Sequence, residues 1–123
     1  RDHLDYHKTF ENYRDAKNGE FIQYVVENTQ GLKTDLSLML RFITSDRGRT
    51  ADIFIDDQKL GDITIQPRMQ GADEQGFFNV EYAIPESLLL DSKGNVKKKL
   101  TFKIVASPNT MCPGLYYVRL MKK

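Results

Sequence analysis

Apolar residues fall on every second position over four long stretches of this sequence, and this period of two constrains the fold most. Successive side chains of a strand point to opposite faces, so the pattern predicts strands with one buried and one wet face. A helix would need apolar residues three and four apart. One-sided strands of this kind are typical of antiparallel sheets. The apolar positions are Leu36, Leu38, Leu40, Phe42, Phe78, Val80, Tyr82, Ile84, Leu100, Phe102, Ile104, Ala106, Tyr116, Val118 and Leu120.

Three further segments also have the character of strands. Residues 51–55 and 60–65 flank a turn that starts with Asp56 and Asp57, and Asp at a turn bonds its own backbone, so we expect a hairpin here. Residues 20–27 are β-rich and apolar on both faces, which predicts a central strand covered on both sides.

Turn-forming segments separate these strands at 28–33, 45–49, 66–76, 91–95 and 107–114. The spacing predicts an all-β fold, a two-sheet antiparallel β-sandwich, jelly-roll-like, with about seven to eight strands. Residues 85–89 are expected to add one helical turn. Residues 1–17 are polar and lack a clear period, which predicts an irregular N-terminal arm. The predicted core contains Leu38, Leu40, Phe42, Val80, Tyr82, Phe102 and Ile104.

Length and charge narrow the classes of function. The 123 residues fit one domain, so 1–123 is expected to be a single sandwich. Lys and Arg total 18 and Asp and Glu total 17, a balance that offers no footprint for nucleic acid. No apolar run is long enough to span a bilayer, so no membrane partner is expected. The chain begins without Met, which favours a piece excised from a longer protein.

Several side chains could carry chemistry, but each has a simpler structural explanation. His3 and His7 are four apart, yet nothing nearby completes a metal site. Asp56, Asp57 and Asp62 could supply paired carboxylates, but they surround a turn, where Asp is expected for backbone reasons. No catalytic residue and no cofactor are therefore expected.

Two loops carry weaker candidates. Cys112 is the one cysteine, so it cannot form an internal disulfide, and it lies far in sequence from any histidine that could activate it. We expect it to pack passively. Asp73 with Glu74, or Asp56 with Asp57, could bind calcium, but the twelve-residue calcium-loop signature is absent. No metal ligand is therefore assigned.

Aromatic side chains could form a platform for a sugar, because the C–H face of a pyranose packs on a π surface. Tyr13, Tyr116 and Tyr117 are the candidates. Core packing is the alternative for aromatics that lie in strand stripes.

Three segments carry a resemblance to a known family. The first runs from Tyr13-Arg14-Asp15 to Phe21, the second from Ser45-Asp46 through Arg49 to Asp56, and the third from Lys103 through Tyr116-Tyr117 to Arg119. Together they resemble the C-terminal β-sandwich domain of bacterial glycoside hydrolases of the β-L-arabinofuranosidase type (the former DUF1680 group). The resemblance covers roughly Tyr13 to Met121.

The resemblance implies that catalysis belongs to a separate (α/α) barrel with a catalytic Glu and a cysteine-rich zinc site, motifs that this sequence lacks. It implies a non-catalytic accessory domain that packs on, or extends, the catalytic barrel of the same parent polypeptide, in a periplasmic or secreted protein. The alternatives are a carbohydrate-binding module for a plant-type polysaccharide and a protein–protein adhesion sandwich. An enzyme in its own right is the interpretation that the residues favour least.

Seven residues are the candidates for a ligand-facing or interface-facing site. Arg14 and Asp15 match the sandwich signature and are predicted to clamp the N-terminal arm, because an Arg fork can bind a carboxylate and backbone carbonyls together. The full set is Tyr13, Arg14, Asp15, Asp46, Arg49, Tyr116 and Tyr117.

Overall fold

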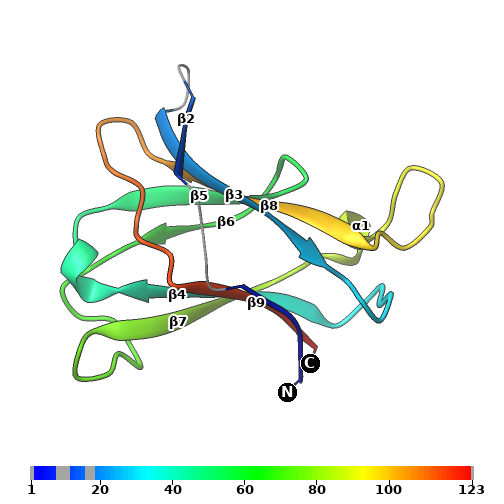
Figure 1. Cartoon of the computed structure of the whole chain (residues 1–123), viewed down its shortest axis with the longest axis horizontal. Coiled ribbons are helices and arrows are strands. Elements are labelled where there is room, and N and C mark those ends of the chain that lie inside the picture. Colours follow the sequence, from blue (N-terminus) through cyan, green and yellow to red (C-terminus); the bar gives the residue numbers. More distant parts are fainter. Residues whose placement is uncertain (1, 8–11, 16–18, 123) are drawn as a thin grey trace.

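Two antiparallel sheets pack face to face in the computed structural model, which describes the backbone of residues 2–7, 12–15 and 19–122 and the side chains of 20–122 (Figure 1). The four-stranded sheet has the order β1-β9-β4-β7, and the five-stranded sheet has the order β2-β3-β8-β5-β6. The strands are β1 (Asp2–His7), β2 (Asn12–Asp15), β3 (Gly19–Glu27), β4 (Leu36–Ile43), β5 (Thr50–Ile55), β6 (Gln58–Thr64), β7 (Phe77–Ala83), β8 (Lys99–Ala106) and β9 (Tyr117–Lys122). The predicted antiparallel β-sandwich is confirmed.

The chain passes from one sheet to the other after β1, β3, β4, β6, β7 and β8. Ile43 pairs with Phe77, Thr50 pairs with Thr64, and the N–H of Ser107 donates to the Thr50 carbonyl at 2.9 Å. The loops 44–49, 65–76 and 107–116 therefore lie at the same end of the sandwich (Figure 1).

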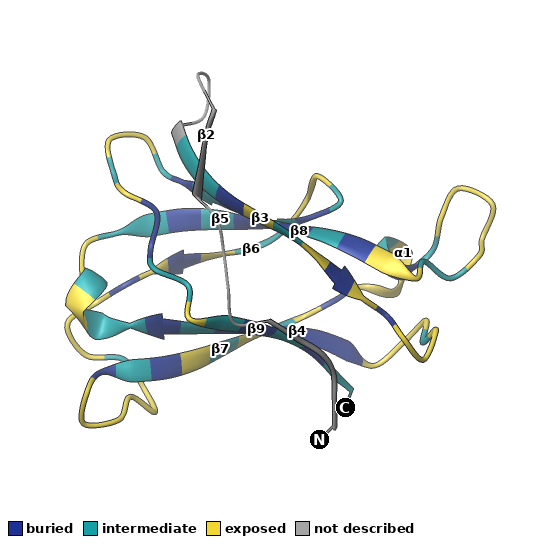
Figure 2. Ribbon diagram, viewed as in Figure 1, coloured by how far each residue is buried: buried dark blue, intermediate teal, exposed yellow. Residues whose placement is uncertain are grey.

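The core lies between the sheets and is built by the alternating stripes (Figure 2). Of the seven predicted core residues, five are fully buried: Leu38, Leu40, Phe42, Phe102 and Ile104. Val80 and Tyr82 pack against this core but are only partly buried, because β7 is an edge strand of its sheet.

The prediction of an irregular N-terminal arm is wrong where the structure describes this segment. Asp2–His7 forms β1, which pairs with β9, and Asn12–Asp15 forms β2, which pairs with β3. Both are edge strands, and together they raise the number of strands above the expected seven to eight. An edge strand is held by backbone hydrogen bonds on one side, so it needs no apolar stripe.

Two predictions about strand faces also need correction. We expected β3 to be covered on both sides, but Val25 on its outer face is 43% exposed, while Ile22 and Val26 are buried. Ser37 falls on the side of β4 that the period of two predicts to be wet, opposite the apolar stripe, but it is 1% exposed. β4 is an interior strand, and Ser37 lies opposite the larger Met121 of β9.

The hairpin between β5 and β6 is confirmed and turns on Asp56 and Asp57, whose φ angles are 47° and 64°. Two consecutive positive φ values suit the right-handed twist of the flanking strands. The carboxylate of Asp56 accepts the N–H of Thr101 at 2.8 Å and the Nζ of Lys97 at 2.7 Å. This aspartate therefore ties the turn to β8 and to the segment before it.

The predicted helical turn is α1 (Glu86–Leu89), which follows Pro85 and buries Leu89. It spans four residues, and no helix in the described part of the chain is long and apolar enough to cross a membrane.

Candidate functional site

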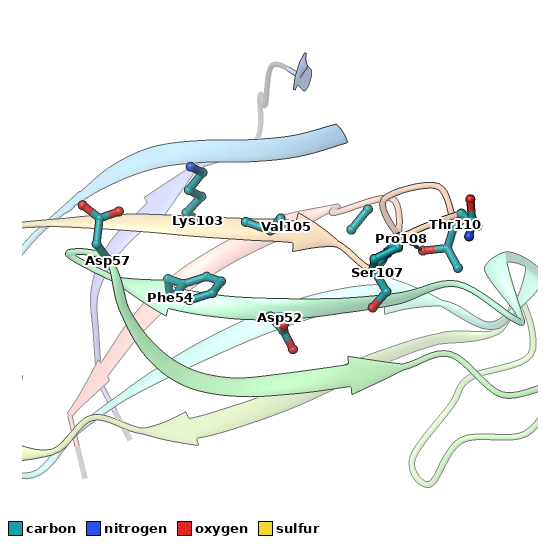
Figure 3. A pocket seen from close by; sticks show the side chains of 10 residues that line it. Asp52, Phe54, Asp57, Lys103, Val105, Ser107, Pro108 and Thr110 are labelled. Atoms are coloured by element: carbon teal, nitrogen blue, oxygen red, sulfur yellow. Dashed lines mark hydrogen bonds between the residues drawn. The ribbon is translucent and has the colours of Figure 1, made fainter. Parts of the chain in front are cut away.

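A groove of about 430 Å³ lies on the outer face of the five-stranded sheet (Figure 3). β5 and β8 form its floor, the turn after β5 borders it at Asp57, and the loop after β8 borders it at the other end. The lining residues are Asp52, Phe54, Asp57, Lys103, Val105, Ala106, Ser107, Pro108, Asn109 and Thr110.

The alternation of the two floor strands explains why these side chains point outward. Ala51, Ile53 and Ile55 of β5 are buried, so Asp52 and Phe54 lie on the opposite face. The pairing of β5 with β8 places Phe54 opposite Lys103. The same burial pattern that builds the core therefore builds the groove.

Charged groups line the groove in opposite signs. The Nζ of Lys103 lies 4.3 Å from the centre of the Phe21 ring on β3, a cation–π contact, and no described side chain accepts a hydrogen bond from it. Asp52 forms an ion pair with Lys59 at 3.3 Å, and both side chains are about half exposed. The Asp57 carboxylate is exposed at the turn. The ammonium group of Lys103 can therefore donate hydrogen bonds to a ligand.

The loop end of the groove is held by backbone and hydroxyl hydrogen bonds. The Oγ1 of Thr110 donates to the Ser107 carbonyl at 2.8 Å and lies 3.2 Å from the Thr50 carbonyl. Asn109, which lies between Ser107 and Thr110 in the chain, has a φ of 65°, and both Pro108 and Asn109 are exposed. The loop thus presents an amide and a proline ring in a fixed conformation.

Asp46 and Arg49 are brought together, but away from this groove. Their side chains form an ion pair at 3.2 Å, and the N–H of Gly114 donates to the other Asp46 oxygen at 2.9 Å. The Nη1 of Arg49 lies 3.4 Å from the Cys112 carbonyl, and Glu20 accepts the N–H of Cys112 at 3.0 Å. These charged groups hold the loop between β8 and β9.

Cys112 lies in that loop with its side chain buried, as expected for a thiol that packs in the core. Burial, helped by the Glu20 carboxylate and opposed by Arg49, raises the pKa of its thiol to about 12. A thiolate is therefore strongly disfavoured at neutral pH. A cavity of about 320 Å³ adjoins it, and the most exposed side chains at its rim are Met111 and Tyr116.

Tyr116 and Tyr117 do not form a shared platform. The Tyr116 ring meets Phe77 edge-on at 4.9 Å, whereas Tyr117 lies beneath the guanidinium groups of Arg41 at 5.5 Å and Arg119 at 4.9 Å. Tyr116 is 43% exposed and keeps a free surface, but Tyr117 is covered by cations.

The remaining sequence candidates lie on β1 and β2, whose side chains are outside the described part of the chain. Tyr13, Arg14 and Asp15 pair through their backbones with Phe21, Glu20 and Gly19. The proposed clamp by Arg14 and Asp15 therefore stays a prediction. His3 and His7 fall in β1.

The aspartates considered for metal or acid–base chemistry have other contacts. Asp73 pairs with Arg41 at 3.3 Å and accepts the N–H of Phe77, while Asp56 serves the hairpin. Asp62 is exposed and offers its carbonyl to the Tyr82 hydroxyl at 2.8 Å. Among the described residues, no group of three His, Cys, Asp or Glu side chains could hold a metal ion.

The sequence interpretation missed the groove residues Phe54, Lys103 and Asn109. Phe54 carried a signal, because it is a large aromatic at an outward position of a strand whose alternate residues are all apolar. Lys103 could not be placed beside it without knowledge of which strands pair.

Comparisons with known proteins bear on the family and the fold. The model of a family described as "Family of unknown function (DUF6805)" matches residues 7–121. A search of the curated proteins found no match. A solved structure of a family 35 carbohydrate binding module from an environmental isolate is similar, with a TM-score of 0.56 and 12% identity. The alignment covers 98% of this chain and 87% of that one. At this identity the likeness shows a shared sandwich fold. Since the family model covers most of the sequence, the chain belongs to DUF6805, a family of unknown function.

Proposed function

We propose that this domain is a non-catalytic carbohydrate-binding module whose ligand lies in the groove on the outer face of the five-stranded sheet. The observation that carries the proposal is the lining of that groove, where the Phe54 ring adjoins polar side chains from two strands and a loop.

The lining suits a sugar because a sugar ring is apolar on its C–H faces and polar at its edge. Phe54, Val105 and Pro108 offer apolar surface, while Lys103 and Asn109 offer hydrogen-bond donors at the rim. Small-ligand sites combine apolar walls with a few placed polar groups in this manner.

The same groove lacks the environment that glycoside hydrolysis requires. A general acid is a carboxyl group whose pKa is raised by an apolar pocket, opposite a second carboxylate. Asp57 is exposed, and Asp52 is half exposed and paired with Lys59. We therefore assign binding, not bond cleavage. The sandwich that this chain shares with a carbohydrate-binding module supports the assignment.

Isothermal titration calorimetry against soluble plant-type polysaccharides tests the proposal, with Phe54→Ala and Phe77→Ala as a matched pair. Both phenylalanines are half-buried strand residues, but Phe77 lies in the other sheet, outside the groove. Phe54→Ala should weaken binding about tenfold or more, a cost of about 1.4 kcal/mol, and Phe77→Ala should not. Equal effects of the two substitutions, or an absence of binding to any polysaccharide, would contradict the proposal.

A second function is favoured by the exposed apolar side chains at the loop end. Met111 is 59% exposed and Tyr116 is 43% exposed beside one cavity. Together with the resemblance to the C-terminal domain of a glycoside hydrolase, this supports an accessory domain that packs against a catalytic barrel. Hydrogen exchange in a longer parent chain should then be slower at 111–116 than in the isolated domain. Equal exchange rates would rule out packing at this surface.

A further inference from the structure

We infer that the groove takes an extended, uncharged glycan chain that lies along β5 and β8, and not a single terminal sugar or a polyanionic polysaccharide. This inference rests on the proposed function and specifies its ligand class.

The length of the groove supports a chain of several sugar units. Ser107 lies level with Thr50 through its backbone hydrogen bond, and Phe54 is four residues further along β5. At about 3.3 Å per residue this separation is roughly 13 Å, and Asp57 lies beyond Phe54. A single sugar ring is shorter than this floor and could not contact both ends.

The two ends of the groove offer different contacts. Phe54 lies toward the hairpin and supplies an aromatic surface (Figure 3). Asn109 belongs to the loop after β8 and supplies an amide at the other end. Lys103 lies opposite Phe54 on β8. One sugar unit can therefore stack on Phe54 beside Lys103 while a later unit of the same chain reaches Asn109.

The charges favour a neutral ligand. Two carboxylates, Asp52 and Asp57, and one ammonium group, Lys103, line the groove, and Asp52 is already paired with Lys59 at 3.3 Å, so the charges at the groove balance. A polyanion running along the groove would therefore find no net positive charge, and it would meet the exposed Asp57 carboxylate at the hairpin end. Repulsion between a carboxylate of the protein and an anionic group of the ligand lowers the affinity for that ligand. Sugar hydroxyls, in contrast, can accept from Lys103 and donate to either carboxylate.

A series of neutral linear oligosaccharides of increasing length tests the inference. The probes are xylose, cellulose and arabinan oligomers of one to six sugar units. Calorimetric affinity should rise at least about tenfold, roughly 1.4 kcal/mol, between one unit and four units and then level off. Phe54→Ala should weaken binding at every length. Asn109→Gly keeps the positive φ of the loop while removing the amide, and it should weaken binding of the longer oligomers alone.

Charge is tested with polygalacturonate oligomers of matched length at low and high salt. We expect the polygalacturonate oligomers to bind more weakly than the neutral oligomers. Salt should leave the affinity for the neutral oligomers unchanged. An affinity independent of length, or tighter salt-sensitive binding of polygalacturonate, would overturn this inference while leaving the proposed function standing. If no glycan binds at any length, both fail.

Discussion

Single residues decide how the long loop between β8 and β9 is held. Asp46 accepts the N–H of Gly114, Glu20 accepts the N–H of Cys112, and Arg49 contacts both Asp46 and the Cys112 carbonyl. This loop forms no β-sheet hydrogen bonds of its own, so its partly buried backbone groups need other partners. Charged side chains supply these hydrogen bonds. Asp46 and Arg49, which the sequence offered as ligand-facing or interface-facing candidates, therefore have a structural role in these contacts.

Asp46→Ala should destabilise the domain more than a surface aspartate substitution does. The side chain is 14% exposed, and its loss removes a charge-assisted hydrogen bond as well as the ion pair with Arg49. We expect a cost of about 1–3 kcal/mol in urea unfolding. Asp52→Ala is the matched control, because it breaks a pair that is about half exposed and should cost less than about 1 kcal/mol. Equal costs would show that Asp46 does not secure the loop.

The thiol of Cys112 should make stability fall at alkaline pH. Its pKa is raised from the ordinary value of 9.0 to about 12 in the folded state. The unfolded chain therefore loses this proton first, so the contribution is complete below pH 9.0 and is lost as pH rises toward about 12. The free energy of unfolding of Cys112→Ala should decline less steeply over this window than that of the unaltered domain. Parallel pH profiles would refute this assignment.

At the scale of elements, the period of two was enough to predict four strands that build the core, β4, β7, β8 and β9, while β-rich composition and the Asp56-Asp57 turn predicted β3, β5 and β6. It failed for β1 and β2, because edge strands are held by backbone pairing that leaves no apolar stripe to detect. It could not predict the groove, because Phe54 and Lys103 become neighbours only through the pairing of β5 with β8. Register between strands far apart in sequence depends on the whole fold and not on local pattern.

The β5–β6 hairpin offers a direct test of how its two aspartates differ. Both have positive φ, so replacement by glycine should relieve strain at either position. Asp56, however, also binds Thr101 and Lys97, and no described residue forms a hydrogen bond or ion pair with the Asp57 carboxylate. Asp57→Gly should stabilise by up to about 1 kcal/mol, while Asp56→Gly should destabilise by about 1–3 kcal/mol in thermal unfolding. The same sign for both would contradict the assigned role of Asp56.

At the scale of the whole molecule, the chain crosses between the sheets repeatedly and gathers three loops at one end. The inner faces are used for the core, so the outer faces and the loop end remain for function. The groove occupies the outer face of the five-stranded sheet, and the cavity beside Tyr116 occupies the loop end. These are two separate surfaces, which lets one experiment decide between ligand binding and domain packing.

The most direct test of glycan binding in the groove is an amide chemical-shift titration of the labelled domain with a neutral oligosaccharide. The largest shift changes should fall on Asp52–Asp57 of β5 and its turn and on Lys103–Thr110 of β8 and its loop. A titration without shift changes for any neutral glycan, or changes confined to residues 111–116, would contradict the account.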